Sequence, residues 1–431
     1  MAIFLIGILF SVTEGIWYRN LVVSCQDEAK EFYKNLGNET PENGLALLKK
    51  MRQRECMRDI YEANREIIDF AYLSAKYSKT SQAIDFLAFF GVAFDRTHEK
   101  GNQPIHIAAI YNTNQEIIEK LIDQGVDVNA LNEQHISALQ FAIANNPNIG
   151  VSLALIAAGA DVNIQTPDGL NTVFRVTQRA ESVRLLSALI EAGADPNVKF
   201  KKGITALHVA AHEHSNVLFL AILLDGGAEI DVLSNAEWTP LHHAVNFNEH
   251  SQVTKYLLNA GADPNLQTDD GRTALHLGAK NAGRSVVQAL LDAGADVHSL
   301  AEDGRTPLHF AAANTSSVSV ITALLDAGSD INTQADDGMQ ALHYAVQYNK
   351  STGIIRYLLN EGADPNAVTN GGWTALHLAI RFADEATVNL LLSEGADPKI
   401  QNRIFRTLYQ MARENENLAG TDVLLFLETL Q

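Results

Sequence analysis

The chain has 431 residues, a net charge of −19 and a pI near 5.1. The surplus of acidic groups repels phosphates, which excludes non-specific binding of nucleic acid as a function. The two cysteines, Cys25 and Cys56, are too few for a disulfide framework or a cysteine-based zinc cluster.

Residues 1–24 contain an apolar run from Ala2 to Val12 that is too short to span a bilayer. Such a run is typical of the core of a secretory signal, although no Lys or Arg precedes it. Val22-Val23-Ser24-Cys25 resembles the lipobox of bacterial lipoproteins, which implies lipidation of Cys25, but the box lies well beyond the apolar core. Export, retention as a membrane anchor and a cytosolic location in which the segment packs on the first helices all stay open.

Residues 25–62 form a helical extension in our interpretation, with no catalytic motif. Thr40 followed by Pro41 predicts a helix start, because Thr caps a helix and Pro fits its first turn. Further on, Gly91-Val92-Ala93-Phe94-Asp95 is a worn copy of a turn that recurs later in the chain. We therefore expect residues 63–96 to form a degenerate capping repeat.

Residues 97–399 repeat one phrase nine times at a spacing of 33 or 34 residues. The clearest copies are Thr205-Ala206-Leu207-His208, Thr239-Pro240-Leu241-His242, Thr273-Ala274-Leu275-His276, Thr306-Pro307-Leu308-His309 and Thr374-Ala375-Leu376-His377. A fixed period in this range predicts a solenoid, in which each unit packs on its neighbours and the array offers an extended surface.

Each copy predicts two helices and a turn. Thr caps the first helix, and a second helix with an apolar stripe, such as Val253 with Tyr256 and Leu257, ends at a glycine such as Gly261. Asparagines follow the first helix, where we expect them to adopt a left-handed conformation: Asn112, Asn145, Asn246, Asn281, Asn314 and Asn349. Asp-Gly pairs predict a hairpin finger between repeats: Asp168-Gly169, Asp270-Gly271, Asp303-Gly304 and Asp337-Gly338.

The phrase and its turn resemble the ankyrin repeat. The resemblance implies an all-α repeat solenoid of helix-turn-helix units with β-hairpin fingers in a curved stack, with residues 400–431 as a degenerate C-terminal cap. We number the repeats one to nine by the residue in the motif's histidine position: His106, Gln140, Phe174, His208, His242, His276, His309, His343 and His377. In the family this histidine hydrogen-bonds within and between repeats, which implies a structural role.

The chain contains none of the sequence motifs for nucleophilic, phosphate-binding or zinc-dependent catalysis that we sought, and we expect no enzyme and no cofactor. Four further histidines fall near one another in the repeat frame: His212, His214, His243 and His250. We interpret them as exposed side chains on a polar turn rather than as a metal site. An enzyme with an unrecognised site stays an alternative.

Binding surfaces in the family use the hairpin tips and the inner face of the first helices, which implies a protein partner held in a concave groove. The tip position before the Thr holds Ile136, Leu170, Ile204, Trp238, Arg272, Arg305, Met339 and Trp373, and the end of the first helix holds Tyr111, Phe247, Tyr348 and Phe382. Aromatic residues and arginine are the usual anchors of interfaces. We expect the two Trp, two Arg, Met339 and the four rings to contact the partner.

Charge also varies along the fingers. Asp269, Glu302 and Asp336 lie on the fingers of repeats six to eight, whereas Lys199, Lys201 and Lys202 cluster on one earlier finger. This arrangement predicts a bipolar surface that orients a partner. The expected function is a monomeric, non-catalytic interaction scaffold. Its turns resemble those of bacterial ankyrin proteins, some of which resemble host-directed effectors, so an exported protein acting at an envelope or in a host stays an alternative.

Overall fold

The computed structural model describes residues 70–79, 81–89, 92–167, 169–179, 182–349, 351–403 and 407–429. The expectations for residues 1–24 and 25–62, Cys25 included, lie outside these residues. The chain divides into two compact units, Met1–Asp195 and Pro196–Gln431, and each is described by itself.

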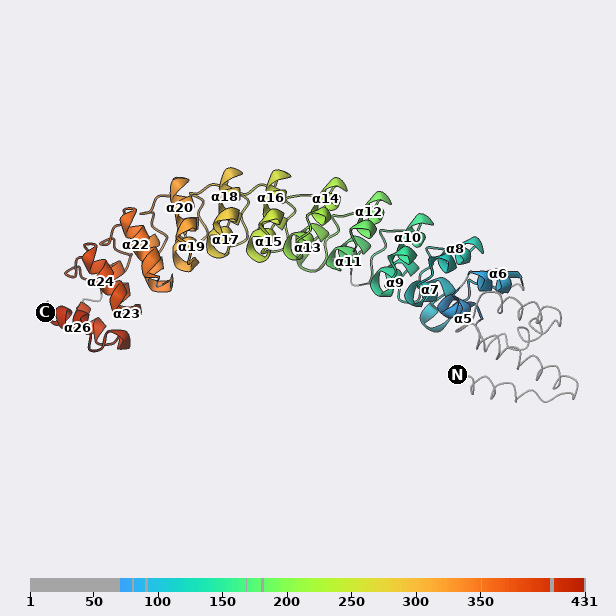
Figure 1. Ribbon diagram of the computed structural model, residues 1–431, viewed down its shortest axis with the longest axis horizontal. Helices are drawn as coiled ribbons and strands as arrows, with labels where there is room; N and C mark the ends of the chain where they lie inside the picture. Colours follow the sequence, from blue (N-terminus) through green and yellow to red (C-terminus); the bar gives the residue numbers. More distant parts are fainter. Residues whose placement is uncertain are drawn as a thin grey trace, which may run out of the picture. The chain divides into compact units, whose positions relative to one another are not determined.

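The first unit consists of successive helix pairs. They are α5 (Phe70–Tyr77) with α6 (Gln82–Phe89), α7 (Pro104–Tyr111) with α8 (Gln115–Asp123), α9 (Ala138–Asn145) with α10 (Ile149–Ala157), and α11 (Thr172–Gln178) with α12 (Val183–Glu191). A short 3₁₀ turn, η1 (Glu99–Gly101), precedes α7. First helices contact the first helices of neighbouring pairs and second helices contact second helices, which gives two rows (Figure 1).

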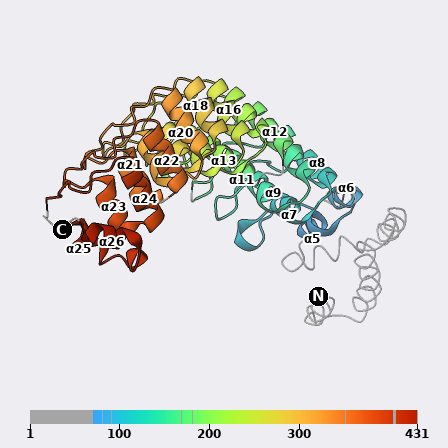
Figure 2. The same cartoon turned by 60° about the vertical axis from the view of Figure 1, so that its left-hand side comes forward.

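The second unit continues the same pairing. Its helices are α13 (Ala206–Glu213), α14 (Leu218–Asp225), α15 (Pro240–Phe247), α16 (Ser251–Asn259), α17 (Ala274–Asn281), α18 (Arg284–Asp292), α19 (Pro307–Asn314), α20 (Val318–Asp326), α21 (Ala341–Tyr344), α22 (Thr352–Asn360), α23 (Ala375–Phe382), α24 (Glu385–Ser393), α25 (Leu408–Ala412) and α26 (Asp422–Glu428). Shorter turns are η2 (Lys201–Gly203), η3 (Ala345–Asn349, a π-helix that extends α21) and η4 (Glu416–Leu418). Loops joining successive pairs gather on one side of the helices (Figure 2).

The repeated phrase explains how each first helix begins. Thr239 is the N-cap of α15: its hydroxyl accepts a hydrogen bond from the His242 amide at 3.3 Å, and its own amide donates to His242 Nδ1 at 3.1 Å. Pro240 occupies the first helical turn, where no backbone donor is needed. Leu241 is 1% exposed and lies in the core between the two helix rows. These features confirm the helical repeat solenoid.

The fingers differ from the expected β-hairpins, because the described residues contain only isolated bridges, such as Phe200 with Ile204. The finger of repeat six is closed by the Thr268 amide donating to the Arg272 carbonyl at 2.9 Å. A single backbone–backbone bond of 3.1 Å, from the Glu302 amide to the Asp270 carbonyl, joins it to the next finger, beside a side-chain bond from Gln267 to the Leu300 carbonyl. One backbone bond per junction is too few for a strand ladder. The close approach also requires Gly271, since a Cβ there would lie 2.6 Å from the Glu302 nitrogen.

Asparagines after the first helices do not adopt the left-handed conformation that we expected. Asn112 has φ −95°, and Asn248, which follows α15, has φ −93°. Asn145, Asn246, Asn281 and Asn314 lie within the last turns of the first helices rather than after them. The Asn248 side-chain amide instead donates to the carbonyls of Ala211 and His214 in the preceding repeat, both at 2.9 Å. The same two-carbonyl contact recurs at Asn112, Asn146, Asn349 and Asn415. The amide therefore satisfies the helix end of the neighbouring repeat.

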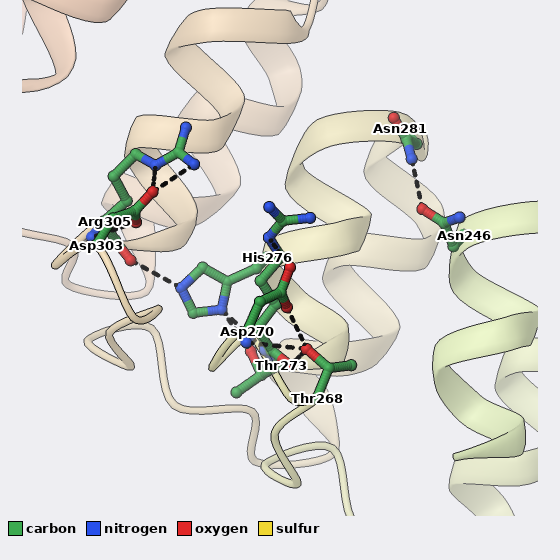
Figure 3. Close-up of polar contacts among 9 residues, drawn as sticks. Asn246, Thr268, Asp270, Thr273, His276, Asn281, Asp303 and Arg305 are labelled. Atoms are coloured by element: carbon green, nitrogen blue, oxygen red, sulfur yellow. Dashed lines mark hydrogen bonds and ion pairs between the residues drawn. The ribbon is translucent and has the colours of Figure 1, made fainter. Parts of the chain in front are cut away.

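Replacing Asn248 by aspartate should destabilise the second unit. The carboxylate cannot donate and would face the carbonyls of Ala211 and His214, which costs about 1–3 kcal/mol. Asn246→Asp is the matched control, because Asn246 only accepts a bond, from Asn281 at 2.7 Å (Figure 3). Urea unfolding should separate the two variants. Equal loss of stability in both would contradict the assigned role of Asn248.

A second asparagine, in the turn after the second helix of most repeats, also joins neighbouring repeats. Asn265 Nδ2 donates to the Gly294 carbonyl at 3.0 Å, and its Oδ1 accepts from the Asp296 amide at 2.8 Å. Asp231 occupies this position in repeat four and only accepts, from the Asp263 amide. Burial, followed by the nearby charge of Asp263, raises the pKa of Asp231 despite that hydrogen bond.

Candidate interaction surface

The histidine of the repeated phrase links its repeat to the next at His106, His208, His276, His309 and His343, whereas Nε2 of His242 and of His377 has no partner among the described residues. His276 Nδ1 accepts the Thr273 amide at 3.1 Å, so the proton resides on Nε2, which donates to the Arg305 carbonyl at 3.0 Å (Figure 3). His208 makes the equivalent contact to the Trp238 carbonyl at 2.9 Å. Burial lowers the pKa of both imidazoles to about 4, which keeps them neutral at pH 7. These histidines are structural and hold the fingers in place.

The side chains named from the sequence form an exposed row on the fingers and first helices of the second unit. We call this row the tip surface and define it as Trp238, Phe247, Asp269, Arg272, Glu302, Arg305, Asp336, Tyr348, Trp373 and Phe382. Phe247 is 49% exposed and Tyr348 is 58% exposed, whereas the two Trp side chains are half-buried.

Trp238 and Phe247 bring a finger tip and a helix end together. Their rings stack with centroids 5.6 Å apart, and His243 lies 5.5 Å from the Trp238 ring. His212, from the preceding repeat, packs on Phe247 at 4.7 Å. Burial lowers the pKa of His243 to about 3, with His208, His212 and His242 adding to the shift. The result is an aromatic cluster at the surface of repeats four and five in which His243 is neutral.

Arg272 and Arg305 are both paired within their own fingers. Arg272 Nε lies 3.1 Å from an Asp270 carboxylate oxygen, and Arg305 contacts Asp303 Oδ2 through Nε at 2.7 Å and Nη2 at 2.6 Å (Figure 3). Burial alone would raise the pKa of Asp303, but the bond and charge of Arg305 outweigh it and lower the pKa. Each guanidinium also covers Phe310, at 5.3 Å and 4.3 Å from the ring centre. The carboxylates and the Phe310 ring thus hold both guanidinium groups in a defined orientation.

Repeats eight and nine supply the remaining rings. Tyr344 stacks on Tyr348 at 6.0 Å and its hydroxyl donates to Asp337 at 3.3 Å. Arg381 covers both Trp373 and Phe382, at 5.4 Å and 5.0 Å from the ring centres. Sequence reasoning missed Tyr344 and Arg381, although their place on the first helix, beside the tip positions, was a usable signal.

Several predicted contact residues lie elsewhere. Met339 is 7% exposed, and we leave it out of the tip surface because a buried side chain cannot anchor a partner. Leu170, at the same position in the first unit, is also buried, at 8%. Tyr111 belongs to the first unit, where it is 54% exposed and lies 4.4 Å beneath the Lys76 ammonium. It is a separate exposed ring.

The lysine finger and the acidic fingers differ in the contacts that their charged side chains make within the chain. Lys199 donates to the Leu233 carbonyl at 2.9 Å, and Lys201 lies over the Phe200 ring at 5.1 Å, whereas Lys202 is exposed. By contrast Asp269, Glu302 and Asp336 are exposed, and their carboxylates make no hydrogen bond or ion pair with the part of the chain that the structure describes.

The histidines outside the motif position are not all exposed side chains on a turn, as we had interpreted them: His214 is only 5% exposed, and His212 and His243 are ring neighbours at 5.9 Å in the cluster around Phe247. His214 stacks on Phe219 at 4.3 Å, and His250 is the N-cap of α16. Within the described ranges, no three His, Cys, Asp or Glu side chains are close enough to hold a metal ion. None of the helices in those ranges is both long and apolar enough to cross a membrane.

Paired helices, buried linking histidines and closed fingers define a helical repeat protein with an exposed tip surface. A family model described as ankyrin repeats (3 copies) matches residues 72–166, 173–268, 246–335 and 312–402, which is more than half of the chain. The chain therefore belongs to the ankyrin-repeat family, whose members are generally protein–protein interaction modules. No curated protein matches it.

Proposed function

We propose that this protein is a non-catalytic scaffold that binds a partner protein through the tip surface of its second unit. The observation that carries the proposal is the exposure of large rings in one row. Phe247 and Tyr348 are about half exposed at the ends of α15 and η3, in ring contact with Trp238 and Tyr344 respectively. Exposed apolar rings grouped on one face are typical of an interaction site.

The existing contacts within the row support this proposal. Arg272 and Arg305 are fixed by carboxylates and by Phe310, and Arg381 is fixed against Trp373, so little side-chain entropy is lost on binding. Motif histidines also pack beside this row, since the ring centres of His242 and His377 lie 6.0 Å from those of Trp238 and Trp373. The surface is therefore rigid before the partner arrives.

Replacing both Trp238 and Trp373 by alanine tests the proposal. Loss of two aromatic anchors, at about 2 kcal/mol each, should weaken capture of the partner by two orders of magnitude or more. The fold should persist, because the His208 bond goes to the Trp238 backbone carbonyl rather than to its ring. Capture from an extract of the cells that make the protein, followed by mass spectrometry, gives the readout.

Tyr256→Ala with Tyr357→Ala is the matched control. These rings are half-buried on α16 and α22, in the row of second helices away from the fingers. The control pair should retain the partner that the Trp pair loses. Equal retention by both pairs, with unchanged circular dichroism, would remove the tip surface as the binding site.

A further inference from the structure

Aromatic rings near the fingers are mostly covered by the chain's own cations. Arg305 lies over Phe310 and Tyr344, and Arg381 lies over Trp373 and Phe382. In the first unit Lys76 covers Tyr111 in the same way. Attraction between a cation and a ring face is therefore the recurrent mode of contact at these positions.

Among the exposed rings of the tip surface, Phe247 in repeat five and Tyr348 in repeat eight have no such cation over them in the described part of the chain. Tyr348 is the one that lies in repeats six to eight. It is 58% exposed, and the ring contact recorded for it in the described part of the chain is the stack on Tyr344. It lies in η3, the π-helix, and irregular turns of this kind are frequent at functional sites. One face of an electron-rich ring is thus open to a cation from outside.

The fingers of repeats six, seven and eight each carry two acidic residues with different surroundings. The inner residue is engaged: Asp270 with Arg272, Asp303 with Arg305, and Asp337 with Tyr344. The outer residue is exposed and makes no hydrogen bond or ion pair with the described residues: Asp269, Glu302 and Asp336. Three carboxylates therefore face outward on consecutive fingers, in a chain of net charge −19.

We propose that the tip surface of repeats six to eight binds an extended, basic segment of the partner protein. Its Lys or Arg side chains pair with Asp269, Glu302 and Asp336, and one of them covers Tyr348. This inference rests on the proposed function and specifies the class of partner. Fingers about 10 Å apart match every third residue of an extended chain that rises about 3.3 Å per residue.

Complementary charge and an open ring together favour a peptide over a free cation. The three carboxylates belong to different repeats, so no single small ion can neutralise them. A chain of spaced cations reaches all three, and the field of the acidic surface accelerates its association. The cation over the Tyr348 ring then adds a contact that salt screens less than it screens the exposed ion pairs.

A defined peptide tests the inference directly. The probe is a fluorescent 15-residue peptide with Arg at every third position and Gly or Ser between, and its partner probe has Gln in place of each Arg. The full-length protein should raise the anisotropy of the Arg peptide and leave that of the Gln peptide unchanged. No binding of the Arg peptide at ionic strength of about 0.15 M would overturn the inference.

Charge variants separate recognition from general attraction. The triple variant Asp269→Asn, Glu302→Gln, Asp336→Asn should weaken the Arg peptide about tenfold, as expected for three exposed ion pairs. The control triple Asp225→Asn, Asp326→Asn, Glu361→Gln removes the same charge from exposed positions at the ends of α14, α20 and α22. It should change affinity less than twofold. If both triple variants weaken binding equally, the net charge of the protein alone explains the binding, and the inference is overturned.

Two Tyr348 variants test the ring contact. Tyr348→Phe keeps the ring face and should bind the Arg peptide like the wild type, whereas Tyr348→Ala should weaken it about threefold. Loss in both variants would assign the contact to the hydroxyl instead. Suppose that the wild type does not bind the Arg peptide, but that the variant Trp238→Ala with Trp373→Ala loses a protein that the wild type captures. The inference is then wrong, and the proposed function stands. If the wild type does not bind the Arg peptide and the double Trp variant retains every captured protein, both the inference and the proposed function are wrong.

Discussion

Leu241→Ala should destabilise the second unit by about 2–5 kcal/mol. Leu241 follows Thr239 and Pro240 in the repeated phrase and is 1% exposed within α15. Truncation removes apolar contacts and leaves a cavity between helices that are already closely packed, since Ala244 in the same helix is fully buried. Thermal and urea unfolding of the variant should both show the loss.

Leu258→Ala is the control for this prediction. Leu258 is also a leucine of repeat five, but it is only half-buried, near the end of α16. Its truncation should cost clearly less than that of Leu241. A thermal midpoint that Leu241→Ala leaves unchanged would contradict the repeat register, because that register places the leucine of the phrase in the core.

Acidification from pH 6.5 to 4 should unfold the repeats. Burial lowers the pKa of His208, His242, His276 and His309 to about 4, against an ordinary value of 6.5 in the unfolded chain. The unfolded state then binds more protons in this window, so stability is complete above pH 6.5 and falls as the pH approaches 4. Each histidine contributes at most about 3 kcal/mol to this dependence. Tm measured against pH gives the readout.

Substitution of the histidines by glutamine is the control for this pH dependence, and repeat two already contains a glutamine in that position. Gln140 occupies the histidine position of repeat two, where its Oε1 accepts the Ser137 amide at 3.0 Å and its Nε2 donates to the Ile164 carbonyl at 2.9 Å. Glutamine therefore keeps both bonds without titrating. His208→Gln with His276→Gln should give a flatter dependence of Tm on pH. An unchanged slope would contradict the role assigned to the histidines.

The repeated phrase allowed the fold to be predicted from sequence because each of its residues acts locally. Thr and Pro set the helix start, and the residues in the Leu and His positions are buried in every copy, so the pattern of one repeat determines its own helices. Helix α26 (Asp422–Glu428) lies within residues 400–431, which we expected to form the C-terminal cap. The ankyrin-repeat family and the helical solenoid were thereby confirmed.

The features that sequence reasoning missed depend on contacts between repeats. Asn112 and Asn349 looked like turn residues, but their side-chain amides bind carbonyls of the preceding repeat. Met339 aligns with the two Trp in the tip position, yet its flexible apolar side chain is buried where the flat indole rings are half-exposed. Arg305 was predicted as an anchor for a partner. Its pairing with Asp303 could not be foreseen, because the sequence does not determine whether two side chains of one finger point toward each other. The division into nine repeats and two caps stays our proposal.

The tip surface is the central claim, and side-chain footprinting tests it most directly. Hydroxyl-radical oxidation of the protein should be measured alone and with its captured partner bound. We predict protection of Trp238, Phe247, Tyr348 and Trp373, with no change at Phe426, which is 43% exposed on α26. Unchanged oxidation of those four rings, with protection confined to the second helices or to Tyr111, would contradict the account.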